Sequence, residues 1–152
     1  MFDVKKYKMG FDIWGLLLFL AIMLPNIIWF LVPAPVDILR NPSVTPTADT
    51  VASVFQVILV AAICALQNST CRKPMGRDWR GGIAAAVLLY FAGWGFYYAG
   101  VTNTLVIMDL CAVPCVAFIL FSLARKNAAA LVAGAGFMIC HVYYGIVNFV
   151  AK

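Results

Sequence analysis

Residues 104–124 read TLVIMDLCAVPCVAFILFSLA, and this stretch decides the fold. It carries one charged side chain, Asp109, and a helix of about 20 apolar residues is what a bilayer core requires. Four more runs have the same character, and the strand-like alternation typical of transmembrane barrels is absent. We therefore predict an all-α integral membrane protein, a single domain over residues 1–152. Its five transmembrane helices are predicted at residues 11–32, 50–67, 82–101, 104–124 and 127–149.

The composition of the chain supports the same class. Of the 152 residues, 64% are hydrophobic and 11% are charged. A soluble domain is about half apolar and about one quarter charged. The predicted helices leave no room for a separate soluble domain.

Basic residues gather on one side of the predicted helices, because only Arg40 and Lys152 fall on the other side. Lysine and arginine concentrate on the cytoplasmic side of membrane proteins, so the N-terminus is predicted inside and the C-terminus outside a bacterial cytoplasmic membrane. The net charge of +5 then reflects topology, and no nucleic-acid partner is expected. The residues on the inner side are Lys5, Lys6, Lys8, Arg72, Lys73, Arg77, Arg80, Arg125 and Lys126.

The long loop at residues 33–49 reads PAPVDILRNPSVTPTAD. Its four prolines favour extended backbone over helix. Val36, Ile38 and Leu39 are its apolar residues, and they would allow it to fold back over the helices as a lid. The alternative is a plain connector.

Polar and aromatic side chains recur in the outer half of every predicted helix. With a rise of about 1.5 Å per residue, they lie roughly 6–12 Å from the outer helix ends. Phe137, His141, Tyr144 and Asn148 share one face at helical spacing, so this stripe is expected to point into the bundle. Aromatic walls with a few polar groups suit a flat hydrophobic ligand. The candidate ligand-binding residues are Asn26, Trp29, Gln56, Tyr90, Trp94, Tyr97, Asp109, Phe137, His141, Tyr144 and Asn148.

Asp109 needs an explanation, because an ionised carboxylate at mid-membrane costs roughly 2.5–3.5 kcal/mol. It must face the interior, stay protonated or pair with another group. His141 is the single histidine and the one cation expected at that depth. One hypothesis is that Asp109 and His141 share a proton or bind a polar group of a ligand. The alternative is a structural hydrogen bond that joins their two helices.

Several kinds of catalytic chemistry are missing from the sequence. The five cysteines form no CxxC pair, a single histidine excludes bis-histidine haem, and no glutamate is present. Neither HExxH, GxSxG nor a P-loop occurs. We therefore predict no enzyme and no metal site, and we assign no cofactor.

The layout resembles the translocator protein family, the tryptophan-rich sensory or peripheral benzodiazepine receptor proteins. Trp29-Phe30 is similar to the family's Trp-Tyr, and residues 41–46 (NPSVTP) to its KPxWxPP loop. Leu89 to Trp94 with Phe96-Tyr97 resembles its LxLNxxWSxxFF, and Arg125, Ala130-Leu131 and Val147-Asn148 resemble its ending. The resemblance implies a pocket under the first external loop for porphyrins, sterols or similar flat lipids, often in a homodimer.

Three functions follow as hypotheses. The first is a membrane protein that binds a flat hydrophobic ligand (a tetrapyrrole, a sterol or a lipid-like molecule) in an outer-leaflet pocket, and transports or senses it. The second is a small proton-coupled secondary transporter, or half of one, that uses Asp109 and His141. The third is an accessory membrane subunit whose polar layer is a docking seam.

Overall fold

The computed structural model describes residues 6–71 and 75–151. Within them lie five helices that are long and apolar enough to cross a membrane, as the sequence predicts, and these suggest an integral membrane protein. A five-residue π-helical turn, η3, continues the last helix. The helices are α1 (Ile13–Leu31), α2 (Pro46–Ala65), α3 (Arg77–Tyr98), α4 (Thr104–Ala124) and α5 (Ala128–Gly145), followed by η3 (Ile146–Val150).

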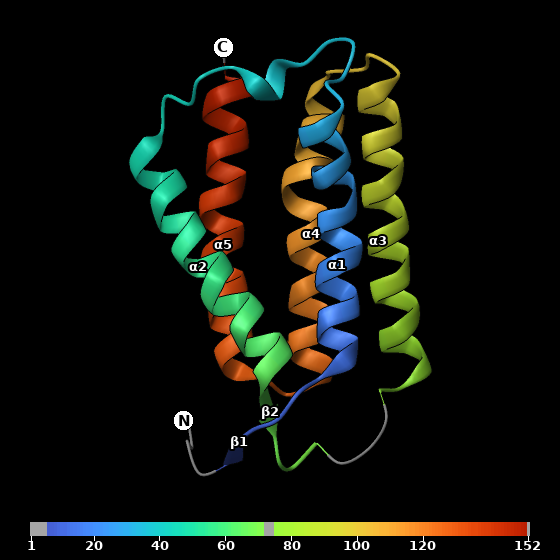
Figure 1. The fold of residues 1–152 in the computed structure, drawn as a ribbon, viewed down its shortest axis with the longest axis vertical. Helices are drawn as coiled ribbons and strands as arrows, with labels where there is room; N and C mark the ends of the chain where they lie inside the picture. Colours follow the sequence, from blue (N-terminus) through green and yellow to red (C-terminus); the bar gives the residue numbers. More distant parts are fainter. Residues whose placement is uncertain (1–5, 72–74, 152) are drawn as a thin grey trace.

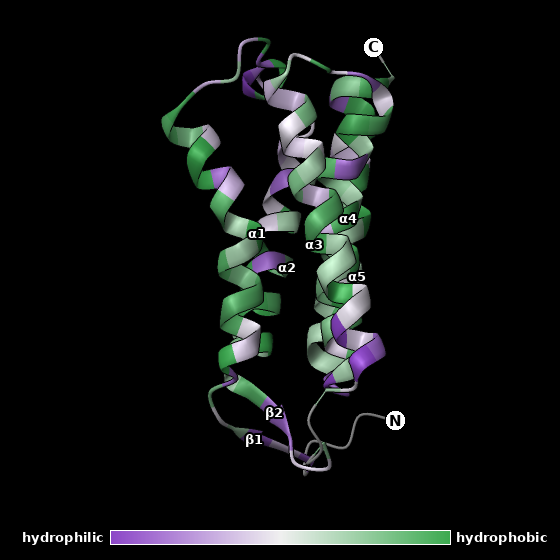
Figure 2. Ribbon diagram, turned by 90° about the vertical axis from the view of Figure 1, so that its right-hand side faces the viewer, coloured by the Kyte–Doolittle hydropathy of each residue, from purple (hydrophilic) through white to green (hydrophobic). Residues whose placement is uncertain are grey.

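The two ends of the bundle are built differently (Figure 1). At one end, here called the strand end, β1 (Tyr7–Met9) pairs antiparallel with β2 (Leu66–Asn68). At the other, the loop end, residues 32–45 cross from α1 to α2 and include the 3-10 turn η2 (Ile38–Arg40). We call residues 32–45 the crossing loop. Figure 2 shows hydrophilic residues concentrated toward these two ends, with the helices mostly hydrophobic between them.

Two helices begin earlier than their hydropathy indicates. α2 starts at Pro46 and α3 at Arg77, so the predicted starts at residues 50 and 82 are wrong. Proline suits the first helical position, because its fixed φ matches the helix and its missing N–H would have no partner there. Asp49 and Asp78 lie in these first turns, where the helix dipole favours an acid. Hydropathy does not detect the start of a helix whose first turn is polar. Because α2 begins at Pro46, Asp49 belongs to this helix and not to the loop.

The short strands were also not predicted, because three residues are too few to show an alternating pattern. They hold the start of α1 beside the end of α2. At Gly15 of α1, an added β-carbon would overlap the carbonyl oxygen of Ile63, so only glycine permits this approach. α1 and α2 therefore touch near the strand end, whereas Figure 1 shows them far apart at the loop end.

α4 is the most buried helix, because half of the residues in its apolar stretch are buried inside the bundle. It lies between α3 and α5, to which it is joined by short connections. Asn127 caps α5 and is 3% exposed. Its Nδ2 donates to the carbonyl oxygens of Ala62 (2.9 Å) and Leu66 (2.8 Å), which fixes the start of α5 to the end of α2.

Candidate ligand-binding cavity

A cavity of about 400 Å³ lies between the five helices, in the half of the bundle toward the loop end. This volume falls within the range of roughly 300–1,000 Å³ that is typical of small-molecule sites. Leu39 of the crossing loop also lines it. Eight of the predicted site residues line the cavity: Asn26, Trp29, Gln56, Tyr90, Trp94, Phe137, His141 and Tyr144.

Aromatic rings form two walls of the cavity. On the α1 and α3 side, the Trp29 and Trp94 ring centroids are 6.2 Å apart, and Tyr90 meets Trp94 edge to face at 6.4 Å. On α5, the His141 ring stacks against Phe137 at 4.9 Å and against Tyr144 at 6.0 Å. The spacing of these α5 residues in the sequence thus corresponds to one stacked column. Flat rings on both sides suit a flat ligand.

Several polar groups on the lining have no partner in the part of the chain that the structure describes. Asn26 Nδ2 donates to the Ile22 carbonyl oxygen (2.8 Å) and to the Tyr90 hydroxyl (2.7 Å), and its Oδ1 accepts no hydrogen bond from a described residue. Among the described residues, the side chains of Gln56, His141 and Tyr144 make no hydrogen bond. A polar group in apolar surroundings costs free energy unless it is hydrogen-bonded. These groups are therefore free to bind the polar atoms of a ligand.

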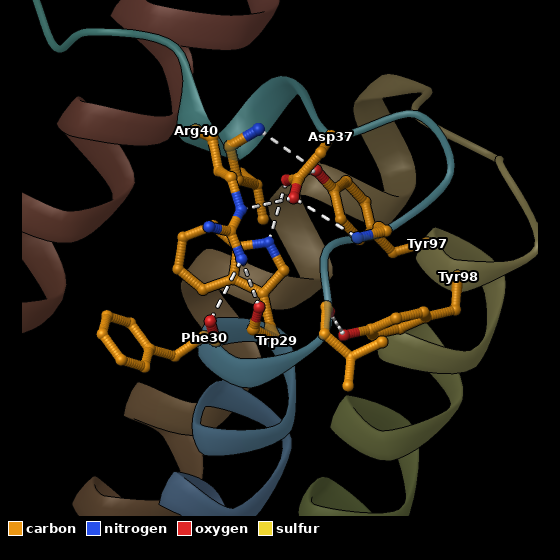
Figure 3. Close-up of polar contacts among 9 residues, drawn as sticks. Trp29, Phe30, Asp37, Arg40, Tyr97 and Tyr98 are labelled. Atoms are coloured by element: carbon orange, nitrogen blue, oxygen red, sulfur yellow. Dashed lines mark hydrogen bonds and ion pairs between the residues drawn. The ribbon is translucent and has the colours of Figure 1, made fainter.

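Tyr97, a predicted site residue, does not line the cavity. Its hydroxyl donates to Asp37 Oδ1 (2.9 Å) and accepts from the Leu39 N–H (3.1 Å) in the crossing loop. Asp37 Oδ1 also accepts from Trp29 Nε1 (2.8 Å), and Asp37 Oδ2 accepts from Arg40 Nε (2.8 Å) (Figure 3). Tyr97 thus holds the loop in place.

Asp37 is the centre of this network and is not among the residues predicted from the sequence. Burial by itself raises the pKa of its carboxyl group, but hydrogen bonds from Trp29, Tyr97 and Arg40 outweigh burial and lower the pKa below its usual 3.8. An acid among proline-rich residues carries no local signal of this role. Its partners come from three segments, so only the tertiary structure identifies it.

Arg40 fastens the same part of the loop to the end of α1. Its Nη2 donates to the carbonyl oxygens of Trp29 (2.6 Å) and Phe30 (3.3 Å), and its guanidinium lies 4.9 Å from the Trp29 ring centroid. The Tyr98 hydroxyl donates to the Val32 carbonyl oxygen (2.6 Å). Figure 3 shows Arg40 beside Trp29, which itself lines the cavity, and Tyr98 bound separately to the backbone of the loop.

Asn148 holds the other end of the crossing loop and also lies off the cavity. It is 2% exposed, and its Oδ1 accepts from the Val44 N–H at 2.8 Å. Its Nδ2 donates to Thr45 Oγ1 (2.9 Å) and to the Tyr144 carbonyl oxygen (3.0 Å). Both ends of the crossing loop are thus tied down, and Leu39 reaches the lining, so the loop folds back over the helices.

The structure separates Asp109 from His141. It does not support the hypothesis that these two side chains share a proton or are joined by a hydrogen bond. Asp109 packs against Gly93 of α3, whereas His141 lines the cavity. No hydrogen bond or ion pair joins them in the part of the chain that the structure describes, and Asp109 Oδ2 is buried without a partner there. Helical periodicity places Asp109 at the right depth, but it does not say which neighbouring helix the side chain faces.

Asp49 lines the cavity and was not predicted. It precedes Ala52, Ser53, Gln56 and Val60, which line the same wall at offsets of three, four, seven and eleven residues. That spacing marks one face of a helix. The stripe would have revealed Asp49 if the start of α2 had been placed at Pro46.

Comparison with known proteins finds no matching family model, no matching curated protein and no matching solved structure. Among the described residues, no group of three or more histidine, cysteine, aspartate or glutamate side chains is placed to hold a metal ion. The five cysteines form no disulfide bond. The chemistry of the cavity is therefore the basis for a functional assignment.

Proposed function

We propose that this protein binds a flat, hydrophobic small molecule in the cavity between its five helices. One observation carries the proposal: a volume of about 400 Å³ is lined by aromatic walls and bordered by polar groups that have no partner among the described residues. A cavity closed mainly by apolar surface gains affinity from burial, and a few polar atoms fix orientation. Native mass spectrometry of the purified protein is the direct search for a retained molecule.

We place the route of the ligand to the cavity between α1 and α2. These helices touch at the strand end and diverge toward the loop end, where the crossing loop is tied down by Asp37 and Asn148. Ser53 of α2 lines the cavity and is also exposed on the bundle surface. A hydrophobic ligand would therefore pass sideways from the lipid, and not through the loop.

The proposal includes a translocator-like membrane role, either transport or sensing, with a homodimer as the implied assembly. Its support is the order of the elements: five apolar helices with a long loop after the first, lying over the pocket. We place the strand end in the cytoplasm, because Lys8, Arg77, Arg80, Arg125 and Lys126 lie near it. The crossing loop is then extracytoplasmic.

Tryptophan fluorescence gives a binding test, with 1-pyrenemethanol as a flat, neutral probe. Trp29 and Trp94 line the cavity, whereas Trp14 and Trp79 lie toward the strand end. Saturable quenching is expected to persist in the double variant Trp14→Phe/Trp79→Phe. It is expected to be largely lost in Trp29→Phe/Trp94→Phe.

A pair of neighbouring substitutions on α2 locates the probe. Ser53→Phe places a ring at the opening, and we expect binding to weaken about tenfold, or about 1.4 kcal/mol. Val54→Phe is the matched control, because Val54 is 55% exposed and does not line the cavity. Equal binding by both variants and by the unaltered protein would contradict the proposal.

A proton-coupled transporter is the second candidate, favoured by the buried Asp109 Oδ2 that has no partner among the described residues. An acid inside a membrane protein is commonly a proton carrier. Uptake into proteoliposomes that follows a pH gradient and is abolished by Asp109→Asn would choose this function. Tight binding without flux would choose the first.

A further inference from the structure

We infer that the ligand of this cavity is an organic cation, a flat aromatic group that bears an amine or a quaternary ammonium. The inference rests on the proposed binding function and adds the charge of the ligand to it. It follows from the charges on the cavity lining. Of the described residues that line the cavity, Asp49 is the one acid, and none is a lysine or an arginine.

Asp49 is placed to receive a cation. It lies in the first turn of α2, and its Oδ1 accepts a hydrogen bond from Thr45 Oγ1 at 3.0 Å. Its Oδ2 makes no hydrogen bond and no ion pair within the described residues. Asp49, His141 and Tyr144 line the same cavity, so the carboxylate and the α5 wall border one space. Thr45 thus orients one oxygen and leaves the other available.

Within residues 6–71 and 75–151, no basic side chain pairs with Asp49. Arg40 is the one basic residue of the crossing loop, and its Nε is 2.8 Å from Asp37 Oδ2. Its Nη2 is bound by two carbonyl oxygens, and it is not part of the lining. His141 is the single titratable base on the lining, and an ordinary histidine is mostly neutral at pH 8. At that pH the lining offers a negative charge with no fixed positive counterpart.

The rest of the lining also favours a cation. The faces of Trp29, Trp94 and Tyr90 carry partial negative charge, and a cation over such a face gains about 0.5–2 kcal/mol. Asn26 Oδ1 is an acceptor that has no donor among residues 6–71 and 75–151. Pro114 lacks an N–H, so it leaves the Leu110 carbonyl oxygen without its helical donor, and both residues line the cavity. Acceptors and ring faces together suit an ammonium group.

An anionic ligand meets the opposite conditions. A carboxylate-bearing molecule, such as a tetrapyrrole with propionate groups, would bring a second negative charge toward Asp49 without a basic partner on the described lining. A charge removed from water without a partner is costly. The charge of the lining therefore distinguishes cationic from anionic flat ligands, whereas the shape of the cavity does not.

Three pyrene probes with a common ring and different charge provide the test. They are (1-pyrenylmethyl)trimethylammonium, 1-pyrenemethanol and 1-pyrenecarboxylate, titrated at pH 8 in a non-ionic detergent against the Trp14→Phe/Trp79→Phe protein. We expect the cation to bind at least about tenfold more tightly than the carboxylate, because one carboxylate acts on both with opposite sign. Asp49→Asn should reduce this ratio to within about threefold, because the charge that separates the two probes is then absent.

Asp78→Asn is the matched control. It removes the same charge from the first turn of α3, at the strand end of the bundle, where Asp78 is exposed and does not line the cavity. The ratio of cation to carboxylate affinity should therefore stay unchanged. If 1-pyrenemethanol binds but the cation and the carboxylate bind equally to the unaltered protein, the charge assignment is overturned and the proposed function stands. If none of the three probes binds, both fail. The ratio of cation to carboxylate affinity in the protein that retains Asp49 tests the charge of the ligand even if Asp49→Asn does not fold.

Discussion

Asp109 of α4 packs so closely against Gly93 of α3 that a β-carbon at position 93 would overlap the carboxylate Oδ2. This oxygen is buried and has no hydrogen-bond partner among the described residues. Leu110 Cδ2 would lie 3.4 Å from the same β-carbon, so the space is closed on a second side. The acid that stands out in the apolar run of α4 is therefore accommodated by a missing side chain on its neighbour.

Gly93→Ala should destabilise the bundle because the new methyl group and the Asp109 carboxylate need the same space. Overpacking of this kind typically costs about 1–3 kcal/mol. Thermal unfolding in detergent, followed by circular dichroism, would measure it. Gly95→Ala is the matched control, since nothing lies within 4 Å of a β-carbon there.

A double-mutant cycle tests the cause of that loss. In an Asp109→Ala background the carboxylate is absent, so Gly93→Ala should cost little. Contacting residues typically show coupling energies of about 0.5–3 kcal/mol. Equal destabilisation by Gly93→Ala in both backgrounds would mean that the backbone, and not the carboxylate, resists the methyl group.

Hydropathy alone was sufficient to predict the five helices, because long apolar runs have few alternatives to a membrane helix. The bounds of α4 match the predicted residues 104–124. The starts of α2 and α3 were missed by four and five residues, since their first turns are polar. That error removed Asp49 from consideration, although its spacing with Gln56 fits a helix face.

The residues of the candidate site were predicted only in part, because the sequence reveals helical spacing but not tertiary contacts. Helical spacing and depth identify side chains that point inward, such as Trp94 and His141. They do not distinguish a residue that lines the cavity from one that binds the crossing loop, as Tyr97 and Asn148 do. Nor do they reveal the partners of Asp37, because these lie in segments far apart in the sequence.

The Asp37 network should weaken in acid. The pKa of Asp37 is lowered by folding, so the stability it contributes is complete above its unfolded value of 3.8 and is lost as the pH falls through the lower folded value. Asp37→Asn should cost about 1–3 kcal/mol near neutral pH. In thermal scans from pH 7 to pH 2.5, the gap between this variant and the unaltered protein should narrow only below about pH 4. A gap that already narrows at pH 6 would point to another titrating group.

Asn148→Ala should free the second end of the crossing loop. It leaves the Val44 N–H without its acceptor and removes the Nδ2 donor from Thr45 Oγ1, which keeps its hydrogen bond to Asp49, at a cost of about 1–3 kcal/mol. Arg40 is the one trypsin site within residues 32–45, so cleavage after it reports on loop opening. The detergent-solubilised variant should be cut faster there than the unaltered protein. The exposed helix cap Asn103, changed to alanine, should leave this rate unchanged.

The proposed orientation predicts opposite labelling of the two ends of the bundle. In a cysteine-free background, Asn41→Cys lies in the crossing loop and Ser69→Cys follows β2 at the strand end, and both positions are exposed. The excess of basic residues near the strand end favours its retention in the cytoplasm. A membrane-impermeant maleimide should therefore label Asn41→Cys in intact cells, and Ser69→Cys only after permeabilisation. The reverse pattern would turn the bundle over and place the cavity in the cytoplasmic half of the membrane.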